Sequence, residues 1–258
     1  MTSASRSPVL LLHSGGMSSR QWRRLSETLE PAHRVFAPDF IGSGENPLWP
    51  DDAPFDFVQD VELIERMVDD LGEPVHVVGH SYGGLVAVTM ARRDPKRVLS
   101  VAAYEPVAFG VLYRANDEEG LADLNRVGDV PVFTDFALGG GDLWFEAFID
   151  YWNGKGAWRG MAPSSRESFL RTGRKVFYEV MSLKEDRTPQ AGYAHIIAPA
   201  LFLSGQKSPM AARRVAALLG EAFPHGRSIT IEGAGHMGPL THQGTVNDAI
   251  AAHIKEAS

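Results

Sequence analysis

Short apolar runs alternate with amphipathic segments in the first hundred residues and again near the end of the chain. The apolar runs have the length and composition of buried strands, and they lie at 8–13, 33–38, 74–78, 97–104, 200–204 and 227–231. The segments between them repeat apolar residues every three or four positions, as on one face of a helix, at about 18–29, 55–71, 85–93, 208–220 and 242–256. This alternation predicts an α/β fold with a mostly parallel sheet of about six strands, covered by helices on both faces.

Local signals indicate where several of these helices begin and which way they face. Ser18 or Ser19 is placed to cap the first helix, and Ser208 followed by Pro209 is typical of a helix start. In the segment 55–71 the apolar residues share one face, and we expect the acidic residues on the other.

The alternation stops between residues 107 and 190, where aromatic residues are concentrated and glycines separate short predicted helices. We therefore predict an α/β core from residues 1–106 and 191–258, with a helical cap inserted at 107–190. Most of the cap aromatics are expected to bury the cap against the core. Some should line a pocket, because open α/β sheets bind ligands at the strand ends that such an insertion covers. The pocket candidates are Trp144, Trp152 and Trp158.

The sequence Gly79-His80-Ser81-Tyr82-Gly83 separates an apolar β-branched run from a helix-like segment. A strand-to-helix turn this tight forces a strained backbone on its central residue, and side chains at the flanking glycines would collide with neighbouring elements. Ser81 is then held at the tip of the turn, with the first NH groups of the helix directed toward it. The pattern indicates a nucleophile; the alternative is a glycine-rich turn whose serine only caps the helix.

A serine hydroxyl becomes a good nucleophile only when a nearby base takes its proton, and the usual base is a histidine oriented by a carboxylate. His236 lies in a loop of small residues directly after the last predicted strand, at the same sheet edge as Ser81, and follows it in the chain. We therefore predict His236 as the base. His80 is expected to be a supporting residue, and His13 to order the loop after the first strand.

Four motifs occur in a fixed order along the chain: HSGG at 13–16, DFIGSGEN at 39–46, GHSYGG at 79–84 and GAGH at 233–236. In this order and spacing they resemble the α/β-hydrolase fold superfamily, over essentially the whole chain and most weakly in residues 107–190. The resemblance implies that Ser81 attacks an ester or amide carbonyl and that His236 passes the proton to the leaving group. Because the nucleophile position holds serine, the epoxide hydrolase and haloalkane dehalogenase routes, which need aspartate, are disfavoured.

The resemblance also implies an oxyanion hole. One donor is the backbone NH of Tyr82, and the other is an NH in the loop after the first strand, where Gly15 takes the donor position and Met17 is the alternative. Met17 and Met237 are further candidates for the substrate pocket. Since the first predicted strand begins so near Met1, we expect a shortened sheet without the hairpin with which many family members begin.

The chain departs from the family at the acid. Members mostly carry an aspartate in a G-x-x-D pattern after the strand that corresponds to 200–204, but the matching residue is Ser208, and no Asp or Glu occurs between residues 187 and 220. Some branches place the acid after the strand that follows the nucleophile helix, which is where Glu105 stands. We predict that Glu105 orients His236; the alternative is an incomplete triad with Glu105 as a solvated turn residue.

Charge and composition bear on partners and location. The net charge of −7 and the lack of a Lys/Arg cluster argue against a nucleic acid partner. The chain has no cysteine, so thiol chemistry, disulfides and cysteine zinc sites are excluded, and no metal or cofactor is expected. The apolar run near the N-terminus is too short for a signal peptide or a membrane span. We therefore expect a cytoplasmic protein without a membrane partner; the oligomeric state is not predicted.

Three functions fit these observations. The first is a serine hydrolase that cleaves a small or medium ester, thioester or lactone through an acyl-enzyme. The second is a cofactor-independent dioxygenase or lyase, in which the His–acid pair deprotonates an aromatic substrate, and the third is a hydrolase-like ligand-binding protein. The presence of both Ser81 and His236 favours the first. In each case the partner is a small molecule, and three arginines could either contact a substrate carboxylate or remain solvated: Arg159, Arg166 and Arg171.

Overall fold

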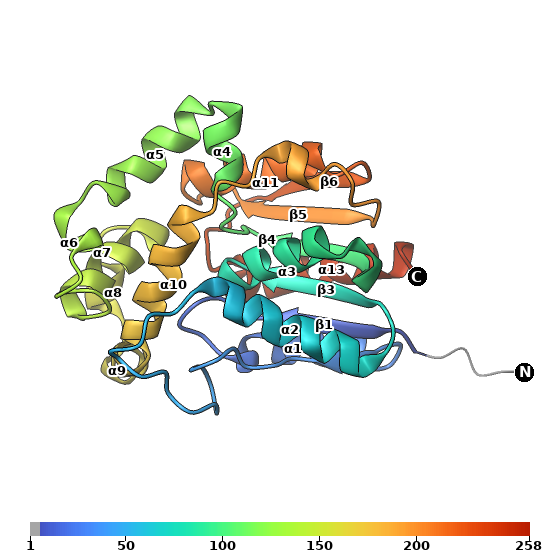
Figure 1. Cartoon of the computed structure of the whole chain (residues 1–258), viewed down its shortest axis with the longest axis horizontal. Coiled ribbons are helices and arrows are strands. Elements are labelled where there is room, and N and C mark those ends of the chain that lie inside the picture. Colours follow the sequence, from blue (N-terminus) through green and yellow to red (C-terminus); the bar gives the residue numbers. More distant parts are fainter. Residues whose placement is uncertain (1–5) are drawn as a thin grey trace, which may run out of the picture.

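The computed structural model describes residues 6–258, and its centre is a single sheet of six parallel strands (Figure 1). The strands are β1 (Pro8–Leu12), β2 (Arg34–Phe36), β3 (Val75–His80), β4 (Val98–Tyr104), β5 (Ala200–Gly205) and β6 (Gly226–Ile231). They lie in the order β2-β1-β3-β4-β5-β6, and every neighbouring pair is parallel. The predicted α/β class with a sheet of about six parallel strands is confirmed.

Helices cover both faces of this sheet. Helices α2 (Phe57–Leu71), α3 (Tyr82–Arg93) and α11 (Met210–Ala222) pack on one face, and α1 (Arg23–Leu29) and α13 (Gln243–Glu256) pack on the other. Strand β1 shows why both faces are apolar. Its Leu10 and Leu12 belong to the first core, whereas Val9 and Leu11 belong to the second, because successive side chains of a strand point to opposite faces.

The remaining elements of the core are short. They are the 3-10 helices η1 (Ser19–Trp22) and η2 (Pro95–Arg97) and the one-turn helix α12 (Gly238–Thr241). Two predicted helix caps are wrong. Neither serine before the first helix caps it, since Ser18 stands at the N-cap of η1 without a side-chain bond, and α11 begins after Pro209 with no capping hydroxyl. A clear cap occurs instead at Asp56, which forms a capping box with Gln59 at the start of α2.

Residues 107–190, which we call the insertion, form helices that lie together at the carboxyl ends of the strands (Figure 1). These are α4 (Gly110–Ala115), α5 (Glu118–Gly128), α6 (Pro131–Thr134), α7 (Asp142–Asn153), α8 (Ala157–Gly160), α9 (Pro163–Arg171) and α10 (Gly173–Glu185), followed by η3 (Gln190–Tyr193). The insertion has an apolar core of its own, in which Trp144, Phe145, Trp158 and Phe177 are fully buried. Its first helix packs elsewhere, since Val111 and Leu112 of α4 belong to the core that α3 and α11 form on the sheet.

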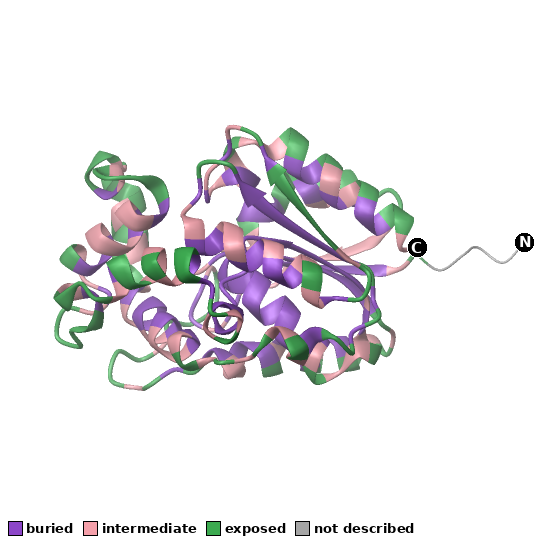
Figure 2. Cartoon of the chain, turned by 90° about the horizontal axis from the view of Figure 1, so that it is seen from above, coloured by how far each residue is buried: buried purple, intermediate pink, exposed green. Residues whose placement is uncertain are grey.

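Burial follows the layers of the fold (Figure 2). Strands β1, β3 and β5 are buried along their whole length, while the edge strand β6 is exposed over most of its residues. Among residues 6–258, no helix is both long and apolar enough to cross a membrane. The same residues contain no group of three or more His, Asp or Glu side chains arranged to hold a metal ion.

Candidate active site

The candidate site lies where the carboxyl ends of β1, β3 and β4 meet the insertion. A cavity of about 290 Å³ opens here, and Ser81, His236 and residues of the insertion line it. The chain runs from β1 outward to β2 and then returns to β3 on the other side of β1, so the order of strands reverses at this point. Ligands of open α/β sheets bind at such a reversal.

Ser81 lies at the turn between β3 and α3 and has a strained backbone. Its φ is 54° and its ψ is −115°, a combination that is rare for a residue with a side chain. The flanking glycines permit this turn, because a Cβ on Gly79 would lie 2.3 Å from the carbonyl oxygen of Gly83, and a Cβ on Gly83 would lie 2.3 Å from that of Leu12. The Ser81 NH donates to the Tyr104 carbonyl at 2.9 Å, which fixes the turn against the end of β4.

The three residues predicted as a triad come together. The Oγ of Ser81 lies 3.2 Å from Nε2 of His236, and Nδ1 of His236 lies 2.6 Å from Oε2 of Glu105. A carboxylate accepts from Nδ1–H, so Nε2 carries the free lone pair and faces the serine hydroxyl. Ser81 is 7% exposed and Glu105 fully buried, so the line of contacts runs from the cavity into the protein interior.

Glu105 is held by the ends of β4 and β5. Its φ is 47°, and its NH donates to the Leu203 carbonyl at 2.8 Å. Its Oε1 accepts from the Gly205 NH at 2.7 Å and from the Ser208 hydroxyl. Ser208 therefore binds Glu105 rather than capping α11, and Glu105 is a buried residue rather than a solvated turn residue. Ser208 stands at the position where the G-x-x-D pattern has its aspartate. This position is the signal in the sequence that could have indicated its contact with Glu105.

Two aromatic rings enclose His236. The ring of Trp152, from α7, is stacked on it at 3.9 Å between centroids with an interplanar angle of 23°. His80 lies on the protein side and its Nε2–H donates to the main-chain oxygen of His236 at 2.9 Å. Burial, with the nearby His236, lowers the pKa of His80 well below its usual value, so His80 is neutral and has a supporting position.

The loop after β1 contains one of the predicted oxyanion donors, Gly15, and the other, Tyr82, is the first residue of α3. Ser14 to Met17 form a turn closed by the bond from the Met17 NH to the Ser14 carbonyl at 3.1 Å, with Gly16 at a φ of 71°. This bond engages the NH of Met17, the alternative donor. In the described part of the chain, the NH groups of Gly15 and Tyr82 donate to no protein acceptor. Both residues line the cavity, so two unengaged NH groups belong to its wall.

His13 ties this loop to the one after β2. Its Nδ1–H donates to the Ser14 carbonyl at 2.8 Å, and its Nε2 accepts from the Phe40 NH at 3.1 Å. Burial lowers the pKa of His13 to about 4, which keeps the ring neutral and able to accept at Nε2. The ordering of the first loop by His13 thus agrees with the expectation from the sequence.

The pocket candidates fall into two groups. Met17, Trp152 and Met237 line the cavity. Trp144 and Trp158 do not: they are fully buried in the core of the insertion, where their indole NH groups donate to the Phe133 carbonyl and to Asp142. Sequence periodicity could not separate the two groups, because both kinds of tryptophan lie on apolar helix faces.

None of the three arginines lines the cavity. Arg159 pairs with Asp142 and Glu146, and Arg166 lies over the face of Trp158 at 6.0 Å from its centroid. The cavity wall does contain a carboxyl group that the sequence analysis missed, that of Glu179 on α10.

Comparison with known proteins agrees with this geometry. A family model described as the alpha/beta hydrolase fold matches residues 7–243. A pimeloyl-[acyl-carrier protein] methyl ester esterase of Aeromonas hydrophila is 27% identical over 247 residues, which cover 91% of this chain and 90% of that protein. An acetyltransferase component (dihydrolipoyllysine-residue) of the acetoin cleaving system of Cupriavidus necator is 38% identical over 113 residues, 43% of this chain and 30% of that protein.

Among solved structures, MenH from S. aureus superposes with a TM-score of 0.74 at 18% identity, covering 99% of this chain and 96% of that chain, which shows the same fold. The fold and the family match define an α/β enzyme of the hydrolase class. The chain belongs to the alpha/beta hydrolase fold family.

Proposed function

We propose that the chain is a serine hydrolase that cleaves a small or medium ester, thioester or lactone through an acyl-enzyme on Ser81. The observation that carries the proposal is the continuous line of contacts from Glu105 through His236 to Ser81, at 2.6 and 3.2 Å, with Ser81 at the cavity wall. A nucleophile, a base within hydrogen-bond reach and a group that orients the base are the parts that acyl transfer needs.

The proposed reaction has two halves. In the first, the Oγ of Ser81 attacks the carbonyl carbon while His236 Nε2 takes its proton, and the resulting oxyanion accepts from the NH groups of Gly15 and Tyr82. The intermediate then expels the alcohol or thiol, which takes the proton from His236. In the second half, water gives a proton to His236 and attacks the acyl-enzyme, and Ser81 recovers its proton as the carboxylic acid leaves. Glu105 offsets the charge of the imidazolium in both halves.

The cavity favours compact, largely apolar substrates. Its volume of about 290 Å³ is at the lower end of the range of roughly 300–1,000 Å³ for small-molecule sites. Most of the wall facing the triad is apolar and comes from the insertion, including Val127, Phe148 and Val180. The near full-length similarity to a protein named as a methyl ester esterase supports ester cleavage as the reaction class.

The test is the reaction with a fluorophosphonate serine probe, followed by intact mass, on the wild type and on Ser81→Ala. We expect one adduct on the wild type and none on Ser81→Ala. The Glu105→Gln variant should hydrolyse p-nitrophenyl acetate and butyrate on the order of 10³–10⁴-fold more slowly than the wild type, because an amide cannot offset the imidazolium charge. A surface variant, Glu256→Gln, serves as the control and should match the wild type.

An unlabelled wild type would sink the covalent mechanism. Oxygen uptake or lyase activity with aromatic substrates would then favour the His–acid chemistry, and ligand binding without turnover would favour a binding protein.

A further inference from the structure

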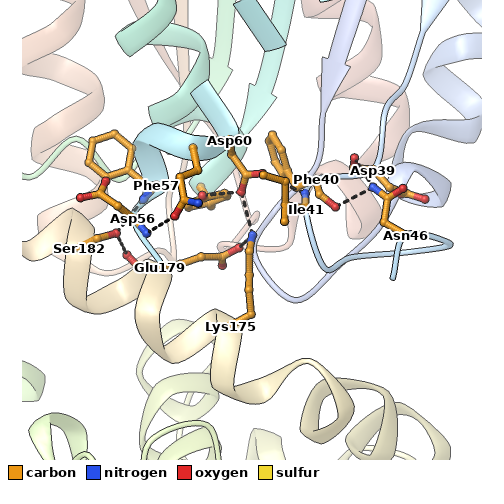
Figure 3. A network of polar contacts seen from close by, with 12 residues as sticks. Asp39, Phe40, Ile41, Asn46, Asp56, Phe57, Asp60, Lys175, Glu179 and Ser182 are labelled. Atoms are coloured by element: carbon orange, nitrogen blue, oxygen red, sulfur yellow. Dashed lines mark hydrogen bonds and ion pairs between the residues drawn. The ribbon is translucent and has the colours of Figure 1, made fainter. Parts of the chain in front are cut away.

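A buried cluster of charged side chains lies beside the candidate active site (Figure 3). Nζ of Lys175 lies 2.8 Å from Oδ2 of Asp60 and also bonds Oε1 of Glu179. The Tyr82 hydroxyl donates to Asp60 Oδ2 at 2.7 Å, and the Ile41 NH donates to Asp60 Oδ1 at 2.9 Å. The cluster therefore joins α10 of the insertion to α2 and α3 of the core, and it is closed to solvent.

Glu179 is the carboxyl group of this cluster that reaches the substrate cavity, which Tyr82 also lines. It is 2% exposed, yet it belongs to the cavity wall. Its Oε1 is engaged by Lys175, whereas its Oε2 accepts no hydrogen bond from any described residue. That oxygen lies 3.0 Å from the position that a Cβ on Gly15 would occupy, so it borders the residue proposed as an oxyanion donor.

The charges of the cluster do not balance. Two carboxyl groups share one ammonium, so the cluster carries one uncompensated negative charge when both are ionised. Glu179 lines the cavity, so a group on a bound ligand can reach its Oε2. A ligand group that donates a hydrogen bond to this largely desolvated oxygen would be stabilised, whereas a carboxylate on the substrate would be repelled.

We propose that Glu179 determines specificity, its Oε2 accepting a hydrogen bond from a hydroxyl group on the α- or β-carbon of the acyl part of the substrate. The inference deepens the proposed function and rests on it, since it assumes that the scissile carbonyl lies at Gly15 and Tyr82. The short separation between Oε2 and Gly15 is what restricts the hydroxyl to these carbons. The substrate class is thus a small hydroxyacyl ester or thioester.

The first experiment compares matched esters, phenyl butyrate and phenyl 3-hydroxybutyrate, which differ only in one hydroxyl. We expect the wild type to favour the hydroxy ester in kcat/KM by about 10-fold or more, as for a hydrogen bond to a charged group. In Glu179→Met, which keeps the shape of the side chain and leaves Lys175 paired with Asp60, this ratio should fall to about 1. Glu185→Met on the exposed end of the same helix is the matched control and should keep the wild-type ratio.

A second readout uses the wild type alone. Burial, together with Asp60, raises the pKa of Glu179 to about 7 against the opposing effect of Lys175. The other groups that face the cluster are Tyr82, whose pKa is raised well above its usual value, and His13, which is neutral. Ionisation of Glu179 strengthens it as an acceptor, so the ratio between the two esters should rise from pH 6 to pH 8. Effects of pH on the shared chemistry of the two esters cancel in the ratio.

Binding to Ser81→Ala separates this inference from the proposed hydrolysis. Calorimetry should give a Kd for the hydroxy ester about 10-fold below that for the plain ester, and Ser81→Ala/Glu179→Met should lose the difference.

Hydrolysis of both esters by the wild type with equal kcat/KM would overturn the role of Glu179 and leave the proposed hydrolase activity standing. Preferential binding of the hydroxy ester without hydrolysis or probe labelling would overturn the hydrolase and leave the recognition by Glu179. Equal binding would overturn the recognition whether or not the esters are cleaved. A higher kcat/KM for phenyl 3-aminobutyrate than for the hydroxy ester would contradict the proposal that a hydroxyl group is the hydrogen-bond donor that Glu179 selects.

Discussion

Two residues of the candidate site hold backbone conformations that cost free energy. Ser81 and Glu105 have φ values of 54° and 47°, and only one other described residue with a side chain, Asn116, has a positive φ. Such conformations cost on the order of 1–3 kcal/mol each and persist only where the surroundings enforce them. Here the enforcing contacts are the hydrogen bonds from the two NH groups to Tyr104 and Leu203. The strain turns both side chains toward His236.

The stacked ring of Trp152 on His236 leads to a prediction for a single side chain. In the proposed acyl transfer, the imidazolium of His236 would lie against the face of an indole, and a cation in that position is stabilised by about 0.5–2 kcal/mol. We expect Trp152→Leu to lower kcat by about 2- to 30-fold, and Trp152→Phe to lower it less. The measurement is steady-state hydrolysis of p-nitrophenyl butyrate. Trp49→Leu, outside the cavity wall, is the control, and a change in KM alone for Trp152→Leu would contradict the role in catalysis.

The residues of the candidate triad could be predicted because Ser81 and Glu105 directly follow apolar strands and His236 lies in the loop after the last strand. Chain order and strand ends were enough to bring Ser81, Glu105 and His236 to one sheet edge. Asp60 could not be found this way: it was expected on the polar face of its helix, but it is fully buried, and its partner Lys175 lies 115 residues away in the chain. A carboxyl group within an apolar periodicity becomes interpretable only once its partner is placed in space.

At the scale of elements, the ends of β4 and β5 share the task of holding the acid. The loop after β5 lacks the usual carboxylate but supplies the Gly205 NH and the Ser208 hydroxyl to Glu105 at the end of β4. The two side chains are in direct contact, so we expect a carboxylate at either position to reach Nδ1 of His236.

This contact predicts the outcome of exchanging the two side chains. Glu105→Ser alone should lose most of the esterase activity, because nothing orients His236. Glu105→Ser/Ser208→Asp should recover at least about 10-fold of that loss, since the new carboxylate reaches the imidazole and accepts from the new hydroxyl. Ser208→Asp alone should have lower esterase activity than the wild type, because two adjacent carboxylates raise the pKa of one another. A folded double variant no more active than Glu105→Ser would refute the shared position.

Helix and strand boundaries show which sequence signals are reliable. The six strands lie within a few residues of their expected positions: β1, β3 and β5 are continuous buried runs, and the largely exposed edge strand β6 is rich in β-branched residues. The sequence predicts that α11 starts at Ser208, whereas the helix starts at Met210. The local signal is misleading because a Ser-Pro pair looks the same whether the hydroxyl caps a helix or donates to a carboxylate. The short helices of the insertion follow the packing of aromatic residues, which local propensity does not specify.

For the molecule as a whole, the buried histidines set the response to acid. Burial lowers the pKa values of His13 and His76 to about 4, and it also lowers those of His80 and His253. An unfolded histidine titrates near 6.5, so the unfolded chain binds more protons than the folded chain between pH 6.5 and 4. Stability is therefore complete above pH 6.5 and falls as the pH falls through this window. Glu179, with its pKa raised to about 7, acts in the opposite direction between pH 7 and 4.5, but it is one group against five, since burial also lowers the pKa of the partly buried His33.

We expect the urea midpoint of unfolding to fall steeply between pH 7 and pH 4.5. Between pH 6.5 and pH 4, His13 and His76 should each lower the free energy of unfolding by about 3 kcal/mol, because their pKa values in the folded chain are about 4. Nδ1 of His76 lies 2.8 Å from the Ser100 hydroxyl, within hydrogen-bond distance, and His76 belongs to strand β3 and does not line the cavity. His76→Gln should be less stable than the wild type at pH 7 but should lose less stability on acidification, because the glutamine does not take up a proton. His225→Gln, at an exposed position, should follow the wild-type curve. If the urea midpoints of His76→Gln and the wild type fall in parallel with pH, acid acts through groups other than His76. If the wild-type midpoint is the same at pH 7 and pH 4.5, the expected linkage between protonation and unfolding is contradicted.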